Sequence, residues 1–189
     1  TPDKVLGYIP SSYEYNPNKA KELLEQSGWV QGDKPITLNT MSELHTKMAQ
    51  VIQANLKDIG INVEIEQNVI GYHMEACGRG EYTLAMSAWS TAPDPDRFLR
   101  PMFHKDSIGA NNFARYNNSE ISKKIDVAVA ILESEKRAQA YNEIHKALMD
   151  DAAIVPISSR MITIAYDARL KNVYQDPIYG MEFNIVRFK

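Results

Sequence analysis

The chain carries PITLNT at residues 35–40 and INVEI at residues 61–65, and these two runs decide the fold. Ile36 and Leu38 face one side of the first run, and the second run alternates apolar and polar residues as a half-buried strand does. Between the runs, apolar residues recur at the 3.6-residue period of a helix that Ser42 can cap and Gly60 can end. Strand, helix and strand in this order predict a βαβ unit with a right-handed crossover.

Helices and strands are predicted on both sides of this unit. Asn16 as a cap and Pro17 at the first helical position open a helix that Gly28 can end. Further patterns are helical at residues 70–80, at 121–132 and from Ser134 onward, and strand-like at 82–88, 154–157, 161–165 and 182–188. Residues 100–117 show few periodic signals. The sequence therefore predicts an α/β fold in which a mixed sheet is flanked by helices.

Composition narrows the class of protein. The chain has 189 residues, 44% of them hydrophobic and 24% charged, which suits a single globular domain or one large lobe. A net charge of -3 gives no reason to expect nucleic acid or an anionic membrane as partner. The lone Cys77 excludes an internal disulfide, and no apolar run approaches the length of a membrane span. The chain starts at Thr1 with no signal peptide in view, so we expect an excised piece of a longer protein.

The stretch AWSTAPDPDRFL at residues 88–99 is the strongest candidate for a binding site. It follows a predicted strand, and its prolines fix φ and stiffen the loop. Trp89 can form an aromatic wall for a ligand, and Ser90 and Thr91 can donate hydrogen bonds to ligand carbonyls. Ligands of open α/β sheets bind beyond the carboxyl ends of the strands, which is where this loop is expected.

Each of these residues also has a purely structural interpretation. Trp89 can cap the end of the sheet, and Ser90 and Thr91 can stabilise the turn. Asp94 can contact the ligand or bind backbone N–H groups of the loop. Asn112 can bind the ligand or bridge its loop to the sheet. Periodicity alone does not choose between these alternatives.

Several segments carry a resemblance to a known family. They read YNPNKAKELL with GW at 15–24 and 28–29, ANLKDIGINV at 54–63, GEY at 80–82, PDPD and FL at 93–96 and 98–99, and NFARYNN at 112–118. In this order and spacing the chain resembles the peptide/nickel-type, family 5, solute-binding proteins of ABC importers. The resemblance covers nearly the whole chain in one register.

The resemblance implies a fold and a function. It implies that residues 1–189 form a single domain, the C-terminal ligand-binding lobe of a larger two-lobed protein with a type II periplasmic-binding-protein-like fold. The ligand would be a small peptide or peptide-like solute, passed to an ABC permease after hinge closure. We then expect an extracytoplasmic monomer of bacterial or archaeal type, in the periplasm or lipid-anchored at the cell surface. No catalysis, cofactor, metal or nucleic acid is expected.

One position departs from the family pattern. Peptide-binding members commonly place an acid three residues after the tryptophan, where it pairs with the peptide α-ammonium group, but this chain has Ala92 there. Asp94 could substitute in a shortened loop. Otherwise the ligand lacks a free α-amine, or the rest of the protein holds that amine. A buried ammonium without a partner costs several kcal/mol, so this choice determines the class of ligand.

Two alternatives come from other functional classes. A hydrolase or metal-dependent enzyme could use Asp94, Asp96 and His104, but the sequence has no Gly-x-Ser-x-Gly elbow, phosphate loop or His-Glu-x-x-His motif. His73 and Cys77 have the i, i+4 spacing that can share a metal, yet no third ligand lies near them in sequence. A lobe that senses a solute and signals to a partner without transport is the third possibility.

Overall fold

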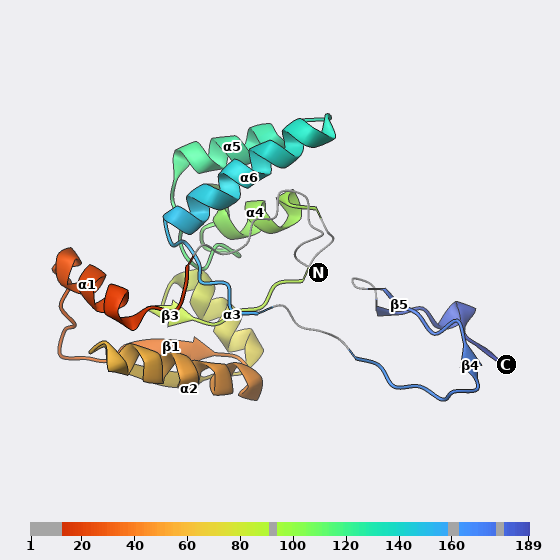
Figure 1. Cartoon of the computed structure of the whole chain (residues 1–189), viewed down its shortest axis with the longest axis horizontal. Helices are drawn as coiled ribbons and strands as arrows, with labels where there is room; N and C mark the ends of the chain where they lie inside the picture. Colours follow the sequence, from red (N-terminus) through yellow and green to blue (C-terminus); the bar gives the residue numbers. More distant parts are fainter. Residues whose placement is uncertain (1–12, 91–93, 159–162, 177–179) are drawn as a thin grey trace.

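The computed structural model describes residues 13–90, 94–158, 163–176 and 180–189. Figure 1 shows three parts. Residues 17–85 form the sheet group, a small sheet with helices, and residues 96–150 form the helical group. The C-terminal arm, residues 163–176 and 180–189, lies apart from both. The mixed helix-and-sheet fold class is therefore confirmed.

The sheet group is built on the predicted βαβ unit. Strands β1 (Ile36–Thr40) and β2 (Val63–Gln67) pair in parallel, and α2 (Glu43–Asp58) connects them. A third parallel strand, β3 (Leu84–Ala85), pairs with the other edge of β1, so the order is β2-β1-β3. Leu38, Ala49, Val63 and Met86 form the core between the sheet and α2. Because all three strands are parallel, their carboxyl ends meet at one edge.

The predicted helix ends are confirmed where a side chain or a glycine defines them. The Asn16 side chain accepts a hydrogen bond from the Lys19 N–H at 2.9 Å at the start of α1 (Pro17–Ser27), and Gly28 closes that helix at φ 64°. The Ser42 hydroxyl caps α2 by accepting from the His45 N–H. Gly80 ends α3 (Ile70–Arg79) at φ 76°. Local hydrogen bonds that need only neighbouring residues thus set these boundaries.

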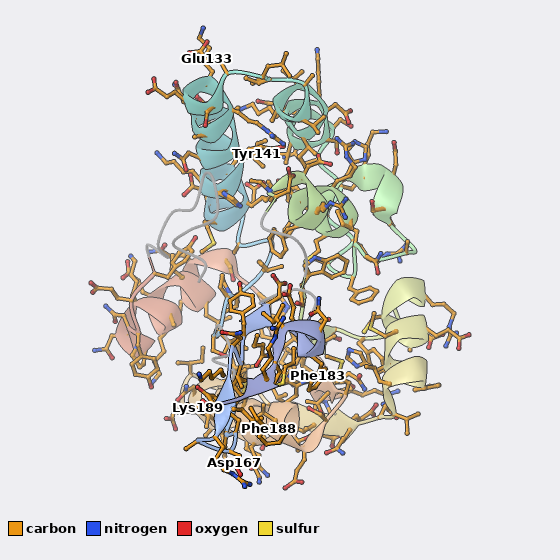
Figure 2. The ribbon with its side chains drawn as sticks, turned by 90° about the vertical axis from the view of Figure 1, so that its right-hand side faces the viewer. Glu133, Tyr141, Asp167, Phe183, Phe188 and Lys189 are labelled. Atoms are coloured by element: carbon orange, nitrogen blue, oxygen red, sulfur yellow. The ribbon has the colours of Figure 1, made fainter. Side chains whose placement is uncertain are left out.

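The helical group has its own core. Helices α4 (Asp96–Phe103), α5 (Ser119–Val129) and α6 (Ser134–Asp150) bury apolar side chains against one another, among them Leu99, Phe103, Ile125, Tyr141 and Ile144. Figure 2 shows Tyr141 inside this group. The helices α5 and α6 follow the prediction. Helix α4 was not predicted, because its first half falls in the predicted binding loop and its second half in the stretch with few periodic signals.

Several predicted strands are wrong or shorter than expected. The strand over 82–88 is reduced to the two residues of β3, and residues 154–157 and 163–165 form no strand. Residues 161–162 lie outside the described part of the chain. In place of one strand over 182–188 the arm has a short 3-10 helix, η3 (Phe183–Ile185), between β6 (Gly180–Met181) and β7 (Arg187–Phe188).

Two short antiparallel strand pairs lie in the arm. β7 pairs with β4 (Leu170–Lys171), and β6 pairs with β5 (Gln175–Asp176). Figure 2 shows Phe183 and Phe188 on the arm, where their side chains are 73% and 72% exposed. Among the described residues, no helix combines the length and the apolar character that crossing a membrane requires.

Candidate functional site

The segment that follows β3 connects the sheet group to the helical group. Met86 is buried in the sheet core, and its N–H donates to the Asn39 carbonyl at 2.8 Å. From there the chain passes through Trp89 and Ser90 and reaches α4 at Asp96. The predicted site therefore starts at the carboxyl edge of the parallel sheet, as the sequence suggested.

Trp89 is partly buried at this connection. Its indole N–H is inaccessible to solvent and has no hydrogen-bond partner among the described residues. Ser90 is exposed, and Thr91 lies outside the described residues. A partly buried aromatic ring next to an exposed hydroxyl can stack on a ligand, and the Ser90 hydroxyl can donate to a ligand carbonyl.

Asp94 is engaged on both of its carboxylate oxygens. Oδ1 accepts from the Asp96 backbone N–H at 2.9 Å, which caps the first turn of α4. Oδ2 accepts from Arg137 Nη2 on α6 at 3.1 Å, and the Arg137 guanidinium lies 5.5 Å from the centre of the Tyr141 ring. These contacts fit the local structural alternative for Asp94, and the ligand-binding alternative stays a prediction.

Asp96 belongs to a second cluster of charged side chains. Arg100 donates from Nε to both Asp96 oxygens at 3.1 Å and from Nη1 to Asp126 on α5 at 2.7 Å. The hydrogen bond from Arg100 is the main reason that the Asp126 pKa is lowered, and the bond with Asp96 does most to raise the pKa of Arg100. The Arg100 guanidinium and the Asp126 carboxylate therefore keep their charges near neutral pH.

Asn112 is almost fully buried, at 1% exposure, and its amide is saturated by the protein. Nδ2 donates to the carbonyls of His104 and Tyr116 at 3.1 and 2.9 Å, and Oδ1 accepts from the Tyr116 N–H at 2.9 Å. These bonds tie the segment before α5 to the end of α4. Of the two roles that the sequence left open for Asn112, the geometry favours the bridging one.

The enzymatic alternative finds no support in this geometry. Asp94 faces Arg137 and Asp96 faces Arg100, whereas His104 Nε2 lies 3.5 Å from Asp126 on α5. No nucleophile and base are brought together in this arrangement. Within the described ranges, no three His, Cys, Asp or Glu side chains gather as a metal site would require.

Asn39, His73 and Cys77 form a buried polar cluster beside the sheet that the sequence pattern did not predict. His73 Nδ1 on α3 is hydrogen-bonded to Asn39 Oδ1 on β1, and His73 Nε2 lies 3.6 Å from Cys77 Sγ. Burial lowers the pKa of His73, with a smaller contribution from the charge of His45, and burial raises the pKa of Cys77. The pair is therefore neutral, and it anchors α3 to the sheet.

Comparison with known proteins identifies the family. The family described as "Bacterial extracellular solute-binding proteins, family 5 Middle" matches residues 1–110. Heme-binding protein A of Haemophilus influenzae is 28% identical over 172 residues, which span 87% of this chain and 31% of that protein. The probable D,D-dipeptide-binding periplasmic protein DdpA of Escherichia coli is 27% identical over 97% of this chain and 36% of its own length.

Solved structures share the fold. The periplasmic binding protein DppA from Helicobacter pylori, in complex with the peptide STSA, has a TM-score of 0.73 and 32% identity over 80% of this chain and 31% of its own. The dipeptide-binding protein from Pseudoalteromonas sp. SM9913, in complex with Met-Leu, has a TM-score of 0.85 and 22% identity over 100% of this chain and 39% of its own. This chain spans about a third of the length of these relatives. It belongs to the family 5 bacterial extracellular solute-binding proteins.

Proposed function

We propose that this chain is the ligand-binding C-terminal lobe of a two-lobed solute-binding protein. The protein captures a peptide or peptide-like solute and presents it to an ABC permease. The observation that carries the proposal is Trp89, whose partly buried ring lies just beyond the carboxyl edge of the parallel sheet. Relatives described as dipeptide-binding support the class of solute.

In this proposal the loop around Trp89 contacts the solute, and neighbouring side chains hold that loop in position. Trp89 stacks on the solute, Ser90 and Thr91 add hydrogen bonds, and Asp94 and Asn112 hold the connecting segments in place. Capture is a binding equilibrium in which the solute favours the closed state of the two lobes, so no chemical step is required.

The C-terminal arm supports the two-lobed proposal. Its aromatic side chains Phe183 and Phe188 are exposed, and none of its described residues belongs to the core of the sheet group or of the helical group. Exposed apolar segments of this kind are normally covered by another part of the molecule or by a partner. We assign the cover to the other lobe. On this account the protein is an extracytoplasmic monomer, in the periplasm or lipid-anchored, of a bacterium or archaeon.

Native mass spectrometry of the intact two-lobed protein, purified without refolding, tests the proposal. We expect small-solute adducts on the wild type, and we expect the Trp89→Ala variant to lose most of them because the stacking surface is gone. Trp29→Ala is the matched control, since Trp29 follows α1 and is 45% exposed. A wild type without adducts, or adducts that survive Trp89→Ala unchanged, would contradict the proposal. A solute-sensing receptor would also carry adducts. A transport protein differs from it because it stimulates an ABC permease when solute is bound.

A further inference from the structure

Three segments leave the carboxyl edge of the sheet side by side. The Asn68 N–H, just after β2, donates to the Thr40 carbonyl at 2.9 Å, and the Met86 N–H, just after β3, donates to the Asn39 carbonyl at 2.8 Å. Because β1 lies between β2 and β3 and neighbouring strands are about 4.8 Å apart, the two outer segments are roughly 10 Å from each other. An extended tripeptide has about this length.

The side chains of these segments carry no formal charge. No Asp, Glu, Lys or Arg occurs in the three stretches at the edge, residues 36–42, 67–72 and 84–90. Glu43, which follows the first stretch, is paired with Lys47 at 2.8 Å, and Glu66, which precedes the second, is exposed to solvent on β2. A charged group that loses water at this edge finds no opposite charge within it, and an unpaired charge is costly to desolvate. The edge therefore favours uncharged groups.

Apolar side chains are exposed at the same edge. Val69 is 76% and Ile70 is 62% exposed, and Met41 and Trp89 are partly exposed on the segments after β1 and β3. A Cβ added at Gly71 would meet nothing within 4 Å, so the space beside Ile70 is open. A group of exposed apolar side chains, as opposed to a single one, marks a surface that binds a ligand or a partner.

The start of α3 gives a second reason to assign a binding role to Val69. Val69 is the N-cap residue of α3, and no side chain caps this helix. Ser, Thr, Asn or Asp at this position would accept a hydrogen bond from the first turn and stabilise the helix, as Asn16 and Ser42 do for α1 and α2. The stability of α3 therefore does not explain Val69, whereas contact with an apolar ligand does.

We propose that this uncharged edge binds an apolar side chain of the solute, with Val69 and Ile70 as the residues that determine this specificity. The proposal rests on the proposed function and refines its class of ligand to peptides or peptide-like solutes with uncharged, apolar side chains. We assign the solute as the occupant because the segment that carries Trp89 leaves the same edge of the sheet. A solute of three residues then reaches from the start of α3 to the Trp89 segment.

Calorimetric titration of the intact two-lobed protein, stripped of its bound solute, tests this proposal. The probes are the tripeptides Ala-Leu-Ala, Ala-Lys-Ala and Ala-Asp-Ala. For the wild type we expect Ala-Leu-Ala to bind at least tenfold more tightly than either charged peptide. In Ile70→Asp the preference for Ala-Leu-Ala over Ala-Lys-Ala should fall at least tenfold, because the new carboxylate pairs with the lysine and loses water against the leucine. Ile70→Leu keeps an apolar side chain and should keep the wild-type ratio.

Val51→Asp is the matched control for the new charge. Val51 is 61% exposed, but it lies about two turns into α2, away from the edge, so the wild-type ratio should persist. The proposal is overturned if the wild type binds a charged peptide within threefold of Ala-Leu-Ala. Equal losses for all three peptides in Ile70→Asp would also overturn it, since they would indicate that Ile70 contacts the other lobe.

A wild type that binds none of the three peptides contradicts the proposal as well. Native mass spectrometry then separates this failure from that of the proposed function. A small solute retained by the protein before stripping leaves the binding function standing, and a protein that carries no solute does not.

Discussion

Asn112 shows how a single buried amide can hold two segments together. Its three hydrogen bonds reach His104 at the end of α4 and Tyr116 before α5. Asn112→Ala leaves the carbonyl and the N–H of the half-buried Tyr116 without their partner, while the His104 carbonyl keeps the Ser107 N–H, so we expect a loss of about 2 kcal/mol in the free energy of unfolding. Urea denaturation measures it. The neighbouring Asn111→Ala, which removes no such bond, should stay within about 0.5 kcal/mol of the wild type, and equal losses in both variants would refute this role.

His73 makes stability depend on pH. Its native pKa is lowered from the ordinary value of 6.5, first by burial and then by the charge of His45. As the pH falls through 6.5 the unfolded chain takes up a proton that the native state refuses, so the free energy of unfolding falls until the lowered native pKa is reached. We expect the difference in stability between pH 7.5 and 5.5 to shrink in His73→Gln.

Urea titrations at the two pH values measure this difference for each variant. His45→Gln is the control, since it removes only the smaller contribution and should keep most of the dependence. An unchanged pH dependence in His73→Gln would show that other groups are responsible.

Side-chain roles that depend on neighbours in sequence were predictable, and roles that depend on distant partners were not. Asn16 and Ser42 cap helices within three residues of themselves, so their roles follow from position alone. Arg137 stands 43 positions from Asp94, and His73 stands 34 positions from Asn39. Only the fold brings these pairs together, and sequence pattern carries no signal for either.

The same division applies to whole elements. The βαβ unit was predictable because its periods and caps are local, whereas residues 154–157 have the composition of a strand without a neighbouring strand to pair with. Helix α4 was missed because it has eight residues and contains Pro101. The burial of Leu99 and Phe103 in the helical core stabilises it, and that is a tertiary effect.

Gly80 ends α3 in a conformation that other residues rarely adopt. Its φ is +76°, and an added Cβ would lie 2.8 Å from Cδ of Arg115. We expect Gly80→Ala to cost about 1–2 kcal/mol in thermal or urea unfolding. Gly28→Ala is the matched control, because Gly28 also has a positive φ but an added Cβ there meets nothing within 4 Å. We expect the larger loss at Gly80, and a loss there no larger than at Gly28 would mean that the flexible Arg115 side chain moves aside without cost.

At the scale of the molecule, the site lies where two separately packed groups meet. The sheet group and the helical group have different cores, and the Trp89 segment runs between them. On the proposed function a ligand bound there would contact the junction, and within the described residues the aromatic side chains Phe183 and Phe188 of the arm stay exposed. This arrangement suits one lobe of a protein that closes on its solute.

Hydrogen exchange of the intact protein, with and without the solute that co-purifies, tests the central claim most directly. The account predicts slower amide exchange over residues 84–90 and 94–100 when solute is bound, because the Trp89 segment becomes buried and ordered. It predicts little change on α5, which lies away from the junction and packs in the helical core. Solute binding proven by calorimetry, with unchanged exchange over the Trp89 segment, would contradict it.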